Sequence, residues 1–176
     1  MSSSDRISRR GALGLFAIVP MLALGGCFTP LYAPDAGGGL SVRDKLSTVA
    51  VDTVEGRVGV EFRNKILFGL TGGAAPAAPA YTLAVVLTST RESSIINAET
   101  SKPEIDTVRL EGVYTLTEIA TGTVITSGKE FAVTSFDRGL QRFAAVRAAR
   151  DAENRLAETL ADQIKNQIAI RFSRQG

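Results

Sequence analysis

The chain has 176 residues with no histidine, no tryptophan and one cysteine, and its 20 basic and 18 acidic side chains give a net charge of +2. Nucleic-acid-binding proteins usually carry a clustered excess of basic side chains, and this nearly balanced composition provides no such excess. The absence of histidine removes the commonest general base, and the single thiol leaves no set of cysteine ligands, so histidine-assisted catalysis and soft metal centres are excluded.

The first 26 residues have the layout of a cleavable lipoprotein signal peptide. Three arginines within residues 6–10 precede an uncharged, largely apolar run over residues 11–24, which is shorter than the about 20 apolar residues of a membrane-spanning helix. The run ends in Leu-Gly-Gly-Cys at residues 24–27, the pattern in which the thiol is acylated and the preceding peptide is removed. We therefore expect a signal peptide over residues 1–26 and lipidation of Cys27.

The mature chain would begin at Cys27 and carry no net charge. Removal of the signal peptide takes away three of the 20 basic residues and one of the 18 acidic residues, which leaves 17 of each. Because acylation consumes the only thiol, the domain must fold without a disulfide. No other apolar run approaches spanning length, so we expect the protein to be anchored to a membrane without crossing it. The pair Arg9–Arg10 leaves twin-arginine export open beside the general route.

Residues 27–46 are expected to be a lipidated N-terminus and tether, and residues 47–176 to be the folded domain. Within this segment, residues 33–39 contain a proline and three consecutive glycines, as in a flexible tether. Residues 47–54 are rich in valine and predict a short strand. Residues 57–70 predict a helix that two glycines end, because apolar side chains recur there every four positions. These apolar side chains are Val58, Phe62, Ile66 and Leu70.

A loop with two prolines over residues 74–80 leads into a predicted three-stranded antiparallel meander. Residues 81–90 alternate apolar and polar side chains, which indicates a strand with one buried face. Residues 91–106 are polar, and we expect either a long loop or a frayed extension of that strand. Residues 107–119 alternate again, and a glycine turn joins them to a last strand over residues 123–134 as a hairpin.

The segment over residues 140–172 is the strongest predicted helix. Leu156, Leu160, Ile164 and Ile168 recur every four residues, and the helix would be roughly 45 Å long at 1.5 Å per residue. The order of elements is strand, helix, three strands, helix (β-α-β-β-β-α). It predicts an α+β fold in which two helices pack on one face of a mostly antiparallel four-stranded sheet.

The run Phe-Thr-Pro-Leu-Tyr at residues 28–32, directly after Cys27, resembles the start of mature LptE proteins, the lipopolysaccharide-assembly lipoproteins. The similarity is greatest to the alphaproteobacterial branch. Phe-Arg-Asn at residues 62–64, the threonine-rich hairpin and the long final helix extend it over nearly all of the mature chain. Family members often carry a glycine between the cysteine and the phenylalanine, and this chain lacks it.

The resemblance implies an outer-membrane, lipid-anchored protein that faces the periplasm. It further implies that the protein plugs the LptD β-barrel, assists its assembly and takes part in lipopolysaccharide delivery to the cell surface. It implies no enzymatic activity, no metal and no cofactor. Phe28 agrees with outer-membrane sorting, because an inner-membrane lipoprotein would be expected to have aspartate there. The alternative is an unrelated outer-membrane α+β lipoprotein that acts as a solute-binding or envelope-scaffolding module.

Two pairs of polar side chains are candidates for a chemical site. Glu158 and Asp162 stand four residues apart on the final helix, but a neighbouring arginine and lysine favour ion pairs on a solvated face over a metal site. Ser127 and Lys129 lie two apart on a predicted strand, yet no oxyanion-hole signature accompanies them. We therefore do not expect an enzyme.

Four basic residues form the best candidate ligand site, because guanidinium and ammonium groups bind the phosphates of lipopolysaccharide. Arg91 and Lys102 lie in the polar segment after the second strand, Arg109 on the polar face of the third, and Lys129 in the fourth. In a meander these side chains could gather at one end of the sheet. The alternative is that each is an ordinary solvated side chain.

Overall fold

The computed structural model describes residues 40–76, 78–96, 103–137 and 141–174. The signal peptide, Cys27, residues 28–32 and Lys102 therefore lie outside the described residues. The helices are α2 (Val42–Ser47), α3 (Gly56–Thr71) and α4 (Arg142–Ser173). The strands are β1 (Val49–Val51), β2 (Tyr81–Ile96), β3 (Pro103–Glu118) and β4 (Val124–Asp137).

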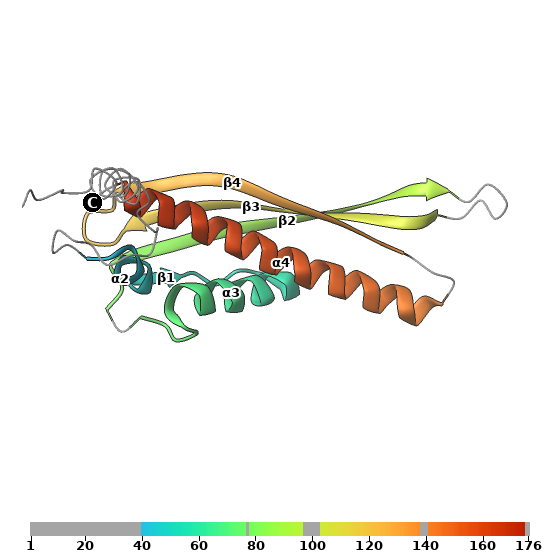
Figure 1. The fold of residues 1–176 in the computed structure, drawn as a ribbon, viewed down its shortest axis with the longest axis horizontal. Helices are drawn as coiled ribbons and strands as arrows, with labels where there is room; N and C mark the ends of the chain where they lie inside the picture. The colour runs from blue at the N-terminus through green and yellow to red at the C-terminus, as the bar shows by residue number, and fades with distance from the viewer. Residues whose placement is uncertain (1–39, 77, 97–102, 138–140, 175–176) are drawn as a thin grey trace, which may run out of the picture.

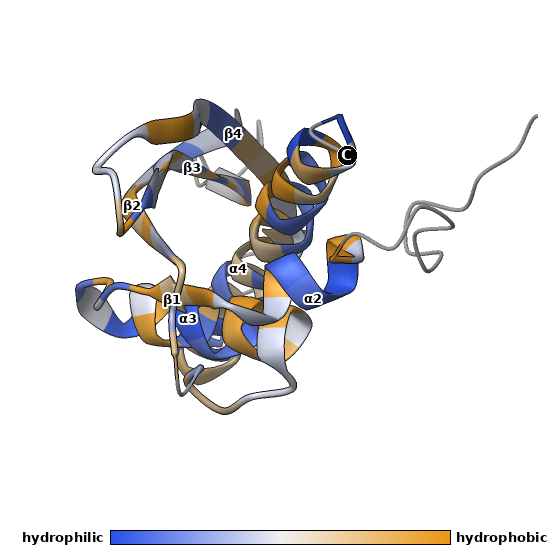
Figure 2. Cartoon of the chain, turned by 90° about the vertical axis from the view of Figure 1, so that its left-hand side faces the viewer, coloured by the Kyte–Doolittle hydropathy of each residue, from blue (hydrophilic) through white to orange (hydrophobic). Residues whose placement is uncertain are grey.

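The four strands form one sheet in the order β1-β2-β3-β4. β1 runs parallel to β2, and the other two pairs are antiparallel. Figure 1 shows α4 lying along the strands with α3 beside it, and the end-on view of Figure 2 shows β2, β3 and β4 as a curved layer that faces α4. The predicted α+β fold, with helices against one face of a mostly antiparallel sheet, is confirmed.

The helix α2 is an element that the sequence pattern did not predict, and all but its last residue lies within residues 27–46, where a tether is expected. Its six residues are too few to show a helical period, but a capping box marks its start. The Ser41 hydroxyl accepts a hydrogen bond from the Asp44 backbone N–H, and the Asp44 carboxylate accepts one from the Ser41 N–H, both at 3.2 Å. Val42 and Leu46 are buried, so α2 belongs to the folded domain.

The helix α3 matches its prediction within one residue at each end. It ends at Gly72, whose φ of 80° is left-handed and whose backbone N–H donates to the Phe68 carbonyl at 3.0 Å. Its predicted apolar face is buried at Phe62, Ile66 and Leu70, and Val58 is partly buried.

Strands β2 and β3 extend beyond the predicted boundaries. For the polar segment over residues 91–106 the sequence allows either a loop or a strand extension, and the described part of it is strand. The two strands pair from Tyr81 opposite Glu118 to Ile96 opposite Pro103. The backbone hydrogen bonds of the ladder hold the two strands together there, and such pairing does not require an alternation of apolar and polar residues in the sequence.

Alternate side chains divide the three long strands into an inner face toward α4 and an outer face toward solvent. On β3, Val108, Leu110, Tyr114 and Leu116 are buried on the inner face. Gly112 lies between them, and an added Cβ there would be 3.1 Å from the Leu160 methyl group Cδ2. The small residue therefore allows α4 to pack directly on the sheet.

The helix α4 supplies most of the core that faces the sheet. Its predicted stripe of Leu156, Leu160, Ile164 and Ile168 is buried along its whole length. Near the end of the helix the Phe172 ring lies 5.0 Å from the Tyr81 ring, centroid to centroid. Within the described ranges, no helix is both long enough and apolar enough to span a membrane.

Candidate functional site

Arg109 and Lys129, two of the four predicted basic residues, lie together on the outer face of the sheet. The Lys129 ammonium is 2.7 Å from one carboxylate oxygen of Glu111, and the Arg109 guanidinium is 3.9 Å from the other. The guanidinium carbon of Arg109 also lies 3.8 Å from the centroid of the Phe131 ring, a cation–π contact. We call Arg109, Glu111, Lys129 and Phe131 the outer-face cluster.

Arg91 lies on the opposite, inner face of the sheet, where it neutralises a buried carboxylate. Its Nε and Nη2 donate to the same carboxylate oxygen of Asp106, at 2.9 and 2.6 Å, and the Ser93 hydroxyl donates to the other oxygen at 2.7 Å. Asp106 is only 1% exposed, and the Arg91 guanidinium lies 4.8 Å from the Phe136 ring centroid. Arg91 therefore has a structural role, because an isolated buried carboxylate is strongly unfavourable.

The strand register explains why the four basic residues do not form one group. It places Arg91 opposite Val108, an inner residue, and places Arg109 opposite Thr90 on the outer face. The spacing within each strand does not reveal the register between strands, so the sequence could not separate these residues. The structure brings Arg109 and Lys129 together and separates them from Arg91.

Exposed apolar side chains surround the outer-face cluster, and sequence reasoning did not assign them to a site. Val86 and Val113 are opposite one another on β2 and β3, and Val133 is opposite Arg109 on β4. Phe131 itself is 49% exposed and Val86 is 68% exposed. An exposed apolar patch of this kind usually marks a surface that binds another molecule. We call Val86, Val113, Phe131 and Val133 the outer-face patch.

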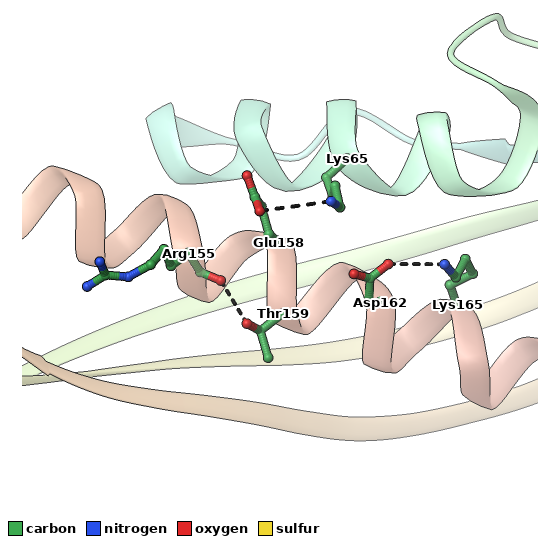
Figure 3. Close-up of polar contacts among 6 residues, drawn as sticks. All are labelled: Lys65, Arg155, Glu158, Thr159, Asp162 and Lys165. Carbon is green, nitrogen blue, oxygen red and sulfur yellow. Dashed lines mark hydrogen bonds and ion pairs between the residues drawn. The ribbon is translucent and has the colours of Figure 1, made fainter.

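The carboxylates of Glu158 and Asp162 on α4 form ion pairs with lysines (Figure 3). Glu158 lies 3.9 Å from the Lys65 ammonium on α3, and Asp162 lies 3.0 Å from the Lys165 ammonium on its own helix. The expected ion pairs on a solvated face are present, although the pair of Glu158 crosses to α3. Among the residues that the structure describes, no three histidine, cysteine or acidic side chains gather where they could hold a metal ion.

A hollow of about 570 Å³ opens between α2, the end of α3 and α4. Its lining combines apolar groups, such as Leu46 and Phe68, with two cationic side chains, Arg43 and Lys165. The hollow lies on the helical side of the domain. Arg91, Arg109 and Lys129, the predicted basic residues that the structure describes, do not line it.

Comparison with known proteins points to one family. The family model described as LptE, lipopolysaccharide-assembly, matches residues 46–168. No curated protein matches the chain.

Three solved lipoproteins share the fold of the chain. A putative lipoprotein from Caulobacter crescentus is 20% identical with a TM-score of 0.64, over 77% of this chain and 97% of that one. Rare lipoprotein B from Shewanella oneidensis is 10% identical with a TM-score of 0.56, over 72% and 97% of the two chains. An uncharacterized lipoprotein B from Nitrosomonas europaea is 11% identical with a TM-score of 0.55, over 77% and 93%.

Proposed function

Since the chain belongs to the LptE family of lipopolysaccharide-assembly proteins, we propose that it is anchored to the outer membrane and plugs the LptD β-barrel. In this role it assists assembly of the barrel and takes part in lipopolysaccharide delivery to the cell surface. The anchor is an acylated Cys27, and the domain faces the periplasm. The protein acts by binding, without catalysis.

The observation that best supports a plug is the outer face of the sheet. A protein enclosed by a barrel needs a surface that suits a polar, hydrogen-bonding wall and also buries apolar groups. The outer-face patch supplies exposed valines and a phenylalanine, and the outer-face cluster places two cations and a carboxylate among them. Interfaces commonly combine an apolar centre with charged groups in this way.

Co-purification in detergent tests the barrel partner. The tagged protein is expected to bring down a barrel of LptD size, and the double variant Val113→Asp/Phe131→Asp is expected to lose it, because two carboxylates would interrupt the outer-face patch. Phe68→Asp is the matched control, since Phe68 is 68% exposed but lies on α3, away from the sheet. The proposed contact surface would be contradicted if the Phe68→Asp control lost the barrel while the double variant retained it. If no barrel accompanies the parent protein, the alternative of a solute-binding or envelope-scaffolding lipoprotein gains support.

We also propose that three of the four predicted basic residues, Lys102, Arg109 and Lys129, contact the phosphates of lipopolysaccharide, whereas Arg91 is paired with Asp106 on the inner face. Charge reversal of Arg91 is an unsuitable test, because a glutamate there would stand beside the buried carboxylate of Asp106 and destabilise the fold. The cleaner variant is Lys102→Glu/Lys129→Glu. Charge-assisted contacts contribute about 1.5–3 kcal/mol each when desolvated and much less when exposed, so we expect about a tenfold loss of affinity.

The matched control for lipopolysaccharide binding is Arg43→Glu/Arg174→Glu, which changes the net charge equally at two exposed positions outside the outer face. Its affinity is expected to equal that of the parent, and added salt is expected to weaken the binding of the parent. Equal affinity of the two double variants would show that the phosphate contacts lie elsewhere.

A further inference from the structure

The hollow between α2, the end of α3 and α4 exposes a large aromatic side chain. Phe68 lines it and is 68% exposed, whereas Leu67 and Leu70 in the same part of α3 are buried. The volume of about 570 Å³ falls within the roughly 300–1,000 Å³ of concave sites that enclose a bound group. The hollow is therefore large enough to take bulky side chains from another segment.

Two cationic side chains from different helices line the same hollow. Arg43 on α2 forms no hydrogen bond or ion pair within the part of the chain that the structure describes. Lys165 on α4 pairs with Asp162 at 3.0 Å (Figure 3), and its stem lies against α3, where a Cβ added at Gly69 would be 3.0 Å from its Cδ. The lining residues that the structure describes include no carboxylate, so the hollow suits an apolar occupant with a negative charge.

The chain itself supplies a segment of this kind before α2. Residues 28–35 read Phe-Thr-Pro-Leu-Tyr-Ala-Pro-Asp, and the carboxylate of Asp35 is their only charge. Apolar side chains gain free energy when they leave water, and two prolines restrict the backbone, which lowers the entropy lost when the segment binds. The bulky side chains that need a cover are Phe28, Leu31 and Tyr32.

The covalent connection is short enough to bring this segment to the hollow. The described chain begins at Leu40, directly before α2, whose Arg43 and Leu46 line the hollow. Tyr32 lies eight positions before Leu40, a span of at most about 29 Å, and the glycines at positions 37–39 permit a reversal of the chain. A segment tethered this closely has an effective concentration in the millimolar range, so a weak contact is enough to hold it.

We propose that residues 28–35 fold back and bind in the hollow. The Tyr32 ring covers Phe68, and its hydroxyl donates to a backbone carbonyl in the last turn of α3, where such groups have no partner within the helix. Asp35 pairs with Arg43. The hollow lies on the helical side of the domain, so the bound segment leaves the outer face of the sheet free for the barrel.

The bound segment would fix the position of the lipid anchor. Cys27 lies 13 positions before Leu40 but only five before Tyr32, so binding reduces its reach from at most about 47 Å to at most about 18 Å. The anchor is then held beside the end of the domain that carries α2, which is also the end where α4 finishes (Figure 1). This consequence rests on the proposed acylation of Cys27, whereas the binding of the segment does not.

The chain contains no tryptophan, so Tyr32→Trp introduces a single fluorophore into the segment. The lipidated mature protein is reconstituted into phosphatidylcholine vesicles with and without brominated acyl chains. We expect blue-shifted emission that acrylamide in the water quenches poorly and that the brominated chains do not quench. The matched control is Leu40→Trp, at a position that is 65% exposed and outside the proposed contact, where acrylamide is expected to quench strongly.

A carboxylate in the hollow should release the segment. In the Tyr32→Trp protein, Phe68→Asp is expected to lower the ratio of bound to free segment on the order of tenfold or more, because it removes the aromatic contact and opposes Asp35. The matched control is Phe131→Asp on the outer face of the sheet, which is expected to leave the ratio unchanged. Circular dichroism and thermal unfolding show whether each variant folds.

Exchange of the two charges tests the ion pair. Asp35→Arg and Arg43→Asp are each expected to lower the ratio about two- to fivefold, the effect of an exposed ion pair, and the double variant is expected to restore it. An aspartate at position 43 lies in the first turn of α2, where the helix dipole favours it, so the helix should persist. Additive losses in the double variant would exclude the pair.

Three results would overturn the proposal. Strong quenching by acrylamide in the Tyr32→Trp protein would place the segment in water, and quenching by the brominated chains would place it in the bilayer. Shielding that persists in the Phe68→Asp variant would mean that the segment packs elsewhere. The barrel contact is tested apart from this, because Phe68→Asp is expected to release the segment and keep the barrel.

Discussion

Gly112 and Tyr114, two inner-face residues of β3, show how single positions control the fit between the sheet and α4. At Gly112 the missing side chain admits the methyl groups of Leu160 and Leu87, which lie 3.1 and 3.2 Å from the position of an added Cβ. At Tyr114 a large ring fills the neighbouring space, and an added Cβ at Gly128 on β4 would lie 2.7 Å from its hydroxyl oxygen. Small and large residues therefore alternate so that the packed layers interlock.

Gly112→Val should destabilise the domain. The new side chain would have to displace Leu160 and Leu87, and overpacking of this kind typically costs about 1–3 kcal/mol of unfolding free energy. The control is Thr90→Val on the exposed outer face of β2, which is expected to change stability by less than about 0.5 kcal/mol. Urea denaturation measures both, and equal effects would mean that α4 does not pack closely at Gly112.

Tyr114 should make the domain sensitive to alkaline pH. Burial, and secondarily the charge of Glu130, raises the pKa of the Tyr114 hydroxyl above its usual value of 10.0. The unfolded chain then loses this proton first, so the contribution to stability is complete below pH 10 and decreases as the pH rises from there toward the folded pKa. The decrease cannot exceed about 1.4 kcal/mol per pH unit.

Unfolding free energies of the parent and of Tyr114→Phe, measured between pH 8 and 11, test this dependence. The variant should show the smaller decrease above pH 10, because it has no hydroxyl to ionise. Parallel curves for the two proteins would show that Tyr114 has the same pKa in the folded and unfolded states.

At the scale of elements, the helical period of apolar residues was the most reliable guide to secondary structure in this sequence. The helices α3 and α4 were predicted within one or two residues because their apolar faces are long enough to show a period of four. The short α2 has only a capping box and two apolar residues, and the polar ends of β2 and β3 owe their pairing to the backbone. Neither is visible as a pattern of apolar side chains.

The candidate site was predicted less well than the fold, for a related reason. The residue types are evident from the sequence. Whether two strands place them on the same face depends on the pairing register between the strands, which the sequence does not reveal. Arg109 and Lys129 both pair with Glu111 on the outer face, whereas Arg91 pairs with Asp106 on the inner face. The outer-face patch was not identified because exposed valines and phenylalanines have the same side-chain chemistry as buried ones.

Leu160→Ala should be strongly destabilising, because Leu160 is fully buried at the centre of the α4 stripe. Truncation of a buried leucine typically costs about 2–5 kcal/mol. Glu158→Ala on the same helix is the control, since its ion pair with Lys65 is exposed and its loss should cost less than about 0.5 kcal/mol. Small, equal effects in thermal and urea unfolding would show that α4 does not pack on the sheet through this face.

At the scale of the whole molecule, the described domain is expected to be one part of a lipid-anchored protein. The Cys27→Ser variant should accumulate as a full-length precursor, because the acylated thiol is required before the signal peptide is removed. Each buried methylene of an acyl chain contributes about 0.8 kcal/mol to membrane binding, so the processed parent should remain with the membrane. Mass spectrometry and membrane sedimentation measure both properties, and normal processing of the serine variant would contradict lipidation at Cys27.

The short β1 has a consequence for amide hydrogen exchange. It pairs with β2 only from Tyr81 to Leu83, so among the described residues the remainder of β2 has a neighbouring strand on one side alone. β3 lies between two long partners and has hydrogen bonds on both sides. In deuterated buffer, alternate amides of β2 beyond Leu83 should therefore exchange within the fast phase, while the amides of β3 are among the last to exchange.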